Sequence, residues 1–175
     1  MAEQPEVWLR GAVPGYPPLL MPVVHTLLQV REDTTRLAAT VPDAYVWIRP
    51  GQAASLGFHV RHTAGALDRL FTYARGESLN DAQKQALRTE GVPGDPPASL
   101  AMLTAELDAA IDRALAQLRA TSTDTLLDER RVGRAELPST TLGLLFHAAE
   151  HSTRHVGQAI TTARALLGTT AEGTR

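Results

Sequence analysis

Apolar side chains recur every three or four residues in four long segments of the chain, and stretches rich in Pro and Gly separate these segments. This spacing predicts amphipathic helices, because an α-helix completes one turn in 3.6 residues. The clearest apolar stripe consists of Leu100, Leu103, Leu107, Ile111, Ala114 and Leu118. A second stripe, between an expected N-cap at Ser55 and a stop at Gly76, consists of Leu56, Val60, Leu67, Phe71 and Ala74. Each segment is therefore expected to form a helix that buries one face.

Two further helices are expected before and after these segments. The first is predicted to open after Pro17-Pro18 and to run to about residue 40, with Pro22 in its first turn, where a missing N–H costs little. The last is predicted over residues 138–168, roughly 40 Å at 1.5 Å per residue. A short extended piece is expected at 45–48 and a long connection at 121–137, and no segment shows a convincing strand alternation.

These segments predict an all-α fold, a four-helix bundle with a short extra helix between helices 2 and 3. The short helix is expected to follow residues 78–81 and to run through Leu87, and a Gly- and Pro-rich loop at 91–97 ends it. A length of 175 residues fits one domain. We expect a single bundle domain over residues 1–168 and a disordered tail at 169–175.

The composition narrows the classes of function. The chain has no cysteine, which excludes disulfides, thiolate metal sites and a cysteine nucleophile. Its net charge of −2, with arginines scattered among acids, argues against nucleic acid as a partner. No signal-peptide pattern and no apolar run long enough to span a bilayer is found. We therefore expect a cytoplasmic protein without membrane association. Since a domain of this size can fold without a structural metal, any bound metal is expected to be functional.

Histidines form the one constellation of chemical interest. The chain has six, at positions 25, 59, 62, 147, 151 and 155. The last three are spaced i, i+4, i+8 along one helix stripe, and β-carbons at i and i+4 lie roughly 5–6 Å apart, so two imidazoles can converge on one ion. His59-x-x-His62 lies on another helix, and neighbouring helices of a bundle are a natural source of a composite metal site. The alternative is that these are ordinary packed or surface histidines, the interpretation we give to His25.

A site of three imidazoles favours particular chemistry. Three neutral ligands leave the charge of a divalent ion uncompensated and one coordination position open, as in catalytic rather than structural sites. All-nitrogen ligation suits zinc, nickel, copper or iron and disfavours calcium and magnesium. We expect zinc, nickel or iron. Glu-x-x-His motifs, which di-iron carboxylate bundles require on two helices, are absent, so that class is set aside.

The segments SLGFHVRHTAGALDRL (55–70) and LLFHAAEHSTRHVGQAI (144–160) resemble the two motif regions of the DinB/YfiT-like metalloenzyme family. That family has a His on its second helix and a His-x-x-x-His pair on its last, often followed by x-Gly-Gln; here Val-Gly-Gln follows the pair. The resemblance implies His62, His151 and His155 as metal ligands. His59 remains a rival to His62 because it lies nearer the apolar stripe. His147, one turn before the pair, is a neighbour that is open to three interpretations: a ligand, a partner of a ligand or a substrate contact.

The resemblance also implies a class of reaction. Similar proteins include thiol S-transferases and a thiol-dependent isomerase, so we expect a metal-dependent enzyme acting on a small molecule, with a low-molecular-weight thiol as partner. A metal-dependent hydrolase and a non-catalytic metal- or ligand-binding stress protein are the alternatives, and a homodimer is the expected assembly. A carboxylate can orient a ligating imidazole through the second ring nitrogen. Asp68, Arg69, Glu150 and Arg154 adjoin the ligands in sequence, and none is assigned a catalytic role.

Overall fold

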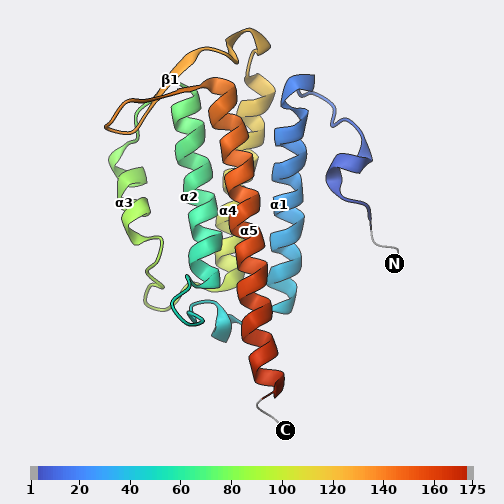
Figure 1. The fold of residues 1–175 in the computed structure, drawn as a ribbon, viewed down its shortest axis with the longest axis vertical. Coiled ribbons are helices and arrows are strands. Elements are labelled where there is room, and N and C mark those ends of the chain that lie inside the picture. Colours follow the sequence, from blue (N-terminus) through green and yellow to red (C-terminus); the bar gives the residue numbers. More distant parts are fainter. Residues whose placement is uncertain (1–3, 173–175) are drawn as a thin grey trace.

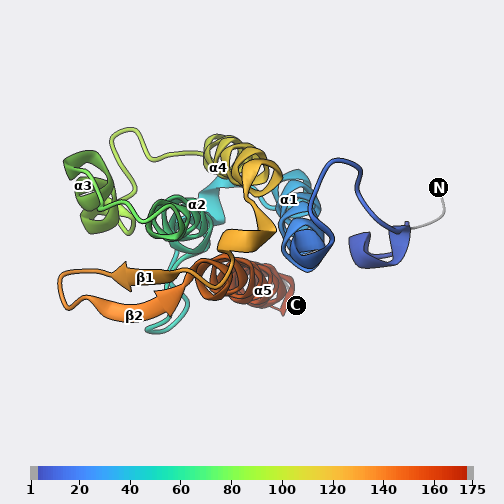
Figure 2. The ribbon, with the colours of Figure 1, turned by 90° about the horizontal axis from the view of Figure 1, so that it is seen from above.

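Four long helices lie side by side in the structure, a computed structural model that describes the chain over residues 4–172, with side chains described up to Gly168. They are α1 (Met21–Thr40), α2 (Leu56–Ala74), α4 (Leu100–Ala120) and α5 (Thr141–Glu172). Helix α2 packs against α4 and α5, and α1 packs against the same two helices, so the four close into a bundle (Figures 1 and 2). The predicted all-α four-helix bundle is confirmed.

Serine N-caps mark where helices α2 and α4 begin. Ser55 is the N-cap of α2, where its side chain accepts a hydrogen bond from the Phe58 backbone N–H. The helix ends at Ala74 with Arg75 as its C-cap, and Gly76 follows with a φ of 78°, a left-handed conformation that glycine adopts without steric cost. Ser99 caps α4 in the same way, by accepting from the Met102 N–H.

The core lies where the apolar stripes predicted it. All five stripe residues of α2 and all six of α4 are buried, and none of these eleven side chains is more than 3% exposed. Each such Leu, Ile or Phe contributes roughly 1.5–3 kcal/mol by leaving water. The stripes therefore fix which faces of α2 and α4 point inward, and with them the direction of the polar side chains on α2.

Helix α3 (Asp81–Thr89) lies outside the bundle, against α2 (Figure 2). This is the short extra helix expected between helices 2 and 3. Asn80 and Gln83 form a reciprocal capping box at its start. No residue of α3 is buried, whereas Glu90, directly after its last residue, is only 4% exposed. The helix is thus attached to the bundle by its polar side chains and its end, not by an apolar face.

Residues 121–140 differ from the prediction. The expected strand-free connection contains an antiparallel hairpin of β1 (Glu129–Val132) and β2 (Leu137–Thr140), and α5 begins at Thr141 rather than at 138. Strands of four residues are too short to display an alternating pattern, and Pro138 within β2 disguises it further. The positive φ values of Gly133 and Glu136 turn the chain between the strands.

Two smaller predictions also differ. The extended piece expected at 45–48 is replaced by a 3-10 helix at Asp43–Tyr45 and a turn, stabilised by the Asp43 carboxylate, which accepts the Leu100 N–H. Helix α5 continues past Gly168 to Glu172, so the first part of the expected tail is helical; residues 173–175 lie outside the described residues. The remaining 3-10 helices are Val7–Arg10, Pro18–Leu20 and Thr123–Thr125. None of the helices in the described part combines the length and the apolar character needed to cross a membrane.

Candidate metal centre

Three histidines from two neighbouring helices meet at one point of the bundle. His62 lies on α2, His151 and His155 lie one turn apart on α5, and one ring nitrogen of each lies within 4.8 Å of those of the other two. The closest pair is His62 Nε2 and His151 Nε2, at 2.9 Å. The structure thus brings together the three residues that were predicted as metal ligands.

Helix geometry accounts for this convergence. The i, i+4 spacing stacks His151 and His155 on one side of α5, with ring centroids 4.5 Å apart. Small residues are buried on either side of this pair along the same helix, since Ala148, Ser152 and Ala159 are each at most 1% exposed. Small side chains let neighbouring helices pack closely, and α2 and α5 form the most extensive helix pair of the bundle. His62 therefore reaches the α5 pair without a long side chain.

The donor set fits a transition metal. Ligand nitrogens of a four-coordinate zinc ion lie roughly 3.3 Å from one another, a value between the shortest separation, 2.9 Å, and the outer limit, 4.8 Å. Imidazole nitrogen suits zinc, nickel, copper and iron rather than calcium or magnesium. Within the described side chains, no other cluster of three His, Asp or Glu residues comes as close together. The three-histidine cluster can therefore hold one ion and leave a coordination position open.

The electrostatics keep two of these rings neutral. Burial, followed by the neighbouring His62, lowers the pKa of His151 to about 4. Burial and the imidazoles of His62 and His151 lower the pKa of His155 to about 4 as well. Only neutral imidazole has a free lone pair for a metal. Both rings are accordingly in the ligating form at neutral pH.

His62 is held by a buried carboxylate that the sequence did not reveal. Its Nδ1 lies 2.7 Å from Glu90 Oε2, and Arg69 Nη1 donates to Glu90 Oε1 at 2.6 Å. Donation by Nδ1–H leaves the Nε2 lone pair facing His151. The carboxylate beside His62 is therefore Glu90, and of the four charged residues named from the sequence only Arg69 contacts it.

No spacing rule could identify Glu90 as this partner. It follows α3, 28 positions from His62, and enters the site only because α3 packs beside α2. The one local signal is Gly65, where a β-carbon would lie 2.7 Å from Arg69 Nη1 and closer still to Glu90 Oε1. The glycine leaves the space that the Arg69–Glu90 pair occupies.

The remaining histidines lie around the cluster or apart from it. His59 is buried, its pKa is lowered by burial, and its Nδ1 lies 3.1 Å from His155 Nδ1. His147 is exposed, with its Nδ1 3.4 Å from Glu150 Oε2 and its ring 5.5 Å from that of His151. His25 is half-buried and pairs with the Gly11 carbonyl. The structure thus places His59 and His147 as neighbours of the cluster and His25 outside it.

Comparison with known proteins agrees with this arrangement. Residues 26–159 match the model of the DinB superfamily. The chain belongs to the DinB superfamily. A crystal structure titled as the conserved protein of a locus from Enterococcus faecalis is similar in fold, with a TM-score of 0.66 and 19% sequence identity over 85% of this chain and 97% of that one. A search among curated proteins finds no match. The resemblance drawn from the histidine motifs is therefore confirmed.

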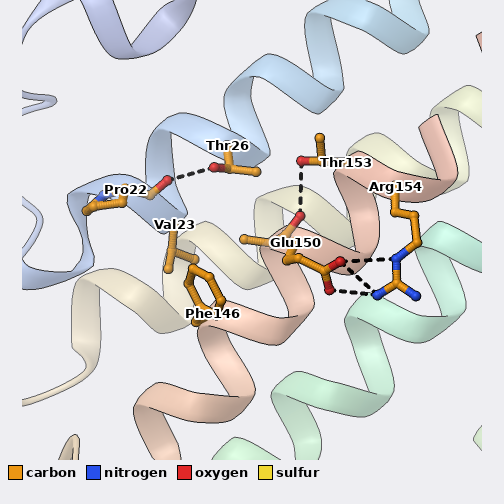
Figure 3. A pocket seen from close by; sticks show the side chains of 8 residues that line it. Pro22, Val23, Thr26, Phe146, Glu150, Thr153 and Arg154 are labelled. Atoms are coloured by element: carbon orange, nitrogen blue, oxygen red, sulfur yellow. Dashed lines mark hydrogen bonds and ion pairs between the residues drawn. The ribbon is translucent and has the colours of Figure 1, made fainter. Parts of the chain in front are cut away.

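Several hollows flank α5 in this DinB-superfamily chain, and two of them lie near His155 and Glu150. One, of about 740 Å³, opens beside the cluster and is lined by Ala53, Ala54, His59, Arg154, His155, Gly157, Gln158, Thr161 and Thr162. The other, of about 340 Å³, lies between α1 and α5, where Phe146 and Val23 face each other and the Arg154 guanidinium turns toward the Glu150 carboxylate (Figure 3). Of the three clustered histidines, His155 lines the larger hollow, next to its neighbour His59.

Proposed function

We propose that this protein is a metal-dependent enzyme in which His62, His151 and His155 hold a divalent transition metal, zinc, nickel or iron, and that it transfers a low-molecular-weight thiol to a small electrophilic substrate. The observation that supports it is the convergence of three imidazole nitrogens with no carboxylate among them. Such a ligand set adds no negative charge, so a bound cation keeps its full attraction for an anionic nucleophile.

The chemistry follows from that charge. A divalent ion in an open site lowers the pKa of a coordinated thiol or water, which supplies the nucleophile at neutral pH. In S-transfer the thiol sulfur forms a bond to an electrophilic carbon, the leaving group departs with the bonding electrons, and the thiol proton passes to solvent. The residues of this chain contribute the neutral rings that bind, the Glu90 contact that orients His62, and the 740 Å³ hollow that admits the substrate.

Metal content is the first test. Untagged wild-type protein is expected to contain close to one metal ion per chain. His62→Ala, His151→Ala and His155→Ala are each expected to lose it, whereas His25→Ala, a histidine outside the cluster, should keep it. Full occupancy in His151→Ala and His155→Ala would overturn the site.

The reaction needs a second assay, in which several cellular thiols are offered with a generic electrophile. Thiol conjugation that requires the metal and disappears in His151→Ala supports the proposed transfer. Ester or amide hydrolysis without added thiol would instead indicate the metal-dependent hydrolase. A metal-loaded protein inactive in both assays would be explained by a non-catalytic metal- or ligand-binding stress protein.

A further inference from the structure

Polar side chains attach α3 to α2 at two places, one at each end of α3. Gln83 Nε2 donates to Asp68 Oδ2 at 2.6 Å and to Thr72 Oγ1 at 2.8 Å, which joins the start of α3 to α2. The end of α3 is joined to α2 through Glu90, whose carboxylate is buried and accepts hydrogen bonds from Arg69 and His62. One of the two attachments of α3 is therefore made to His62, a residue of the three-histidine cluster.

Glu90 is held so that each carboxylate oxygen has one donor. Oε1 accepts from Arg69 and Oε2 from His62, while Glu90 is 4% and Arg69 8% exposed. A buried carboxylate is costly without charged or hydrogen-bonding partners, and the Arg69 guanidinium is the cation that compensates it. Gly65 leaves the space that Oε1 occupies, and the two donors hold Glu90 beside His62.

This arrangement selects the tautomer of His62. A neutral imidazole carries one proton, and a hydrogen bond to a carboxylate holds that proton on the nitrogen that donates. With Nδ1–H on Glu90, Nε2 presents its lone pair toward His151 Nε2. The other tautomer would place a proton inside the cluster and leave Oε2 without its donor.

We infer that Glu90 is a positioning residue, which fixes His62 in the metal-binding tautomer and links the packing of α3 to the occupancy of the metal site. The tautomer part rests on the contacts of the protein alone, and the link to occupancy rests on the proposed function. Coupling between two equilibria is reciprocal. If metal binding depends on the Glu90–His62 bond, a bound metal therefore also stabilises the packing of α3 on α2, and displacing α3 lowers the affinity for the metal.

Glu90→Gln is the variant that tests this inference. It keeps the size of the side chain but replaces one carboxylate oxygen with an NH2 donor, so Arg69 and His62 can no longer each donate to an oxygen of their own. Asp68→Ala is the matched control, because it removes one of the two hydrogen bonds by which Gln83 joins α3 to α2, without touching a histidine. Glu90→Asp, which keeps the charge and withdraws the carboxylate by one methylene, is a second variant should Glu90→Gln fold poorly.

The first measurement is the tautomer of His62 in metal-free protein, read from nitrogen-15 NMR of the imidazole ring. Wild type and Asp68→Ala should show the Nδ1–H form, and Glu90→Gln and Glu90→Asp a mixture with the Nε2–H form. The second is Zn²⁺ affinity by competition with a chelator, which should fall about 10- to 100-fold in the two Glu90 variants and little in Asp68→Ala. The third is amide hydrogen exchange of residues 81–90, which Zn²⁺ should slow in wild type and Asp68→Ala but not in the Glu90 variants.

The outcomes separate this inference from the proposed function. An unchanged His62 tautomer and unchanged Zn²⁺ affinity in the Glu90 variants would overturn the role of Glu90 while leaving the three-histidine site intact. An equal loss of affinity in Asp68→Ala would also overturn it, because general loosening of α3 would then suffice. If wild type binds no Zn²⁺, nickel or iron, the proposed function and the link to occupancy fail together, and the NMR result alone decides whether Glu90 sets the tautomer.

Discussion

His59 Nδ1 lies 3.1 Å from His155 Nδ1. His59, the more buried of the two α2 histidines, thus contacts one member of the three-histidine cluster without belonging to it. Three positions along the helix, His62 reaches His151 instead. This geometry groups His62, and not His59, with His151 and His155, so it favours His62 of the two histidines that helix periodicity left open.

His59→Ala is accordingly expected to bind close to one metal ion per chain, with affinity lowered by at most about tenfold, since it removes a neighbour of a ligand. His62→Ala is expected to lower affinity more than about a hundredfold, because a ligand and its carboxylate support are lost together. Calorimetric titration with Zn²⁺ measures both. Equal losses in the two variants would show that His59 is a ligand.

Gly65→Ala should disturb the Arg69–Glu90 pair. Its β-carbon would lie 2.7 Å from Arg69 Nη1 and closer to Glu90, and such overpacking costs about 1–3 kcal/mol. The higher helix propensity of Ala offsets about 1 kcal/mol of this cost, so the free energy of unfolding is expected to fall only slightly. The affinity for Zn²⁺ is expected to fall clearly, because the Glu90 carboxylate that holds His62 is displaced. Urea denaturation and metal titration measure the two effects.

Gly157→Ala is the control for Gly65→Ala. Gly157 lies on α5 beside His155, is exposed, and would place its β-carbon in open space. This variant is expected to raise the free energy of unfolding by about 0.5–1 kcal/mol and to bind Zn²⁺ as wild type does. The Gly65 argument fails if both alanine variants behave alike.

The metal-free protein should lose stability as pH falls from about 6.5 to about 4. The pKa values of His151 and His155 are near 4 in the folded protein and near 6.5 in the unfolded chain. Between these values the unfolded chain binds more protons, so protonation favours unfolding; above about 6.5 the two histidines contribute no pH dependence. Urea denaturation at pH 7, 5.5 and 4.5 measures this slope. In the double variant His151→Asn, His155→Asn the slope should become shallower, and an unchanged slope would contradict the assignment.

Ser55→Ala should lower the free energy of unfolding by about 1 kcal/mol, the usual cost of losing an N-cap. The hydroxyl accepts the Phe58 N–H at the start of the helix that carries His59 and His62. Ser99→Ala, which uncaps α4, provides the comparison and should cost a similar amount. Denaturant titrations of both variants check this; no loss in either would mean that these caps are not needed.

The sequence predicted the features that depend on local spacing. The stripes from Leu56 to Ala74 and from Leu100 to Leu118 identified the buried faces, and the spacing of His151 and His155 identified a pair that can converge. Glu90 and the β1–β2 hairpin were not predictable in this way. Glu90 reaches His62 through the packing of a separate helix, and the hairpin is too short, and interrupted by Pro138, to show a period.

The division of the cluster between α2 and α5 has a consequence for how the protein matures. His62 and His151 are 89 positions apart, and α2, α3 and α4 are all formed from the chain before α5. Contacts so distant along the chain are made late, after local structure has formed. A metal ion that is held by all three rings can therefore bind only after α5 has docked against α2. Until then, His62 is the only member of the three-histidine cluster on the helices already formed.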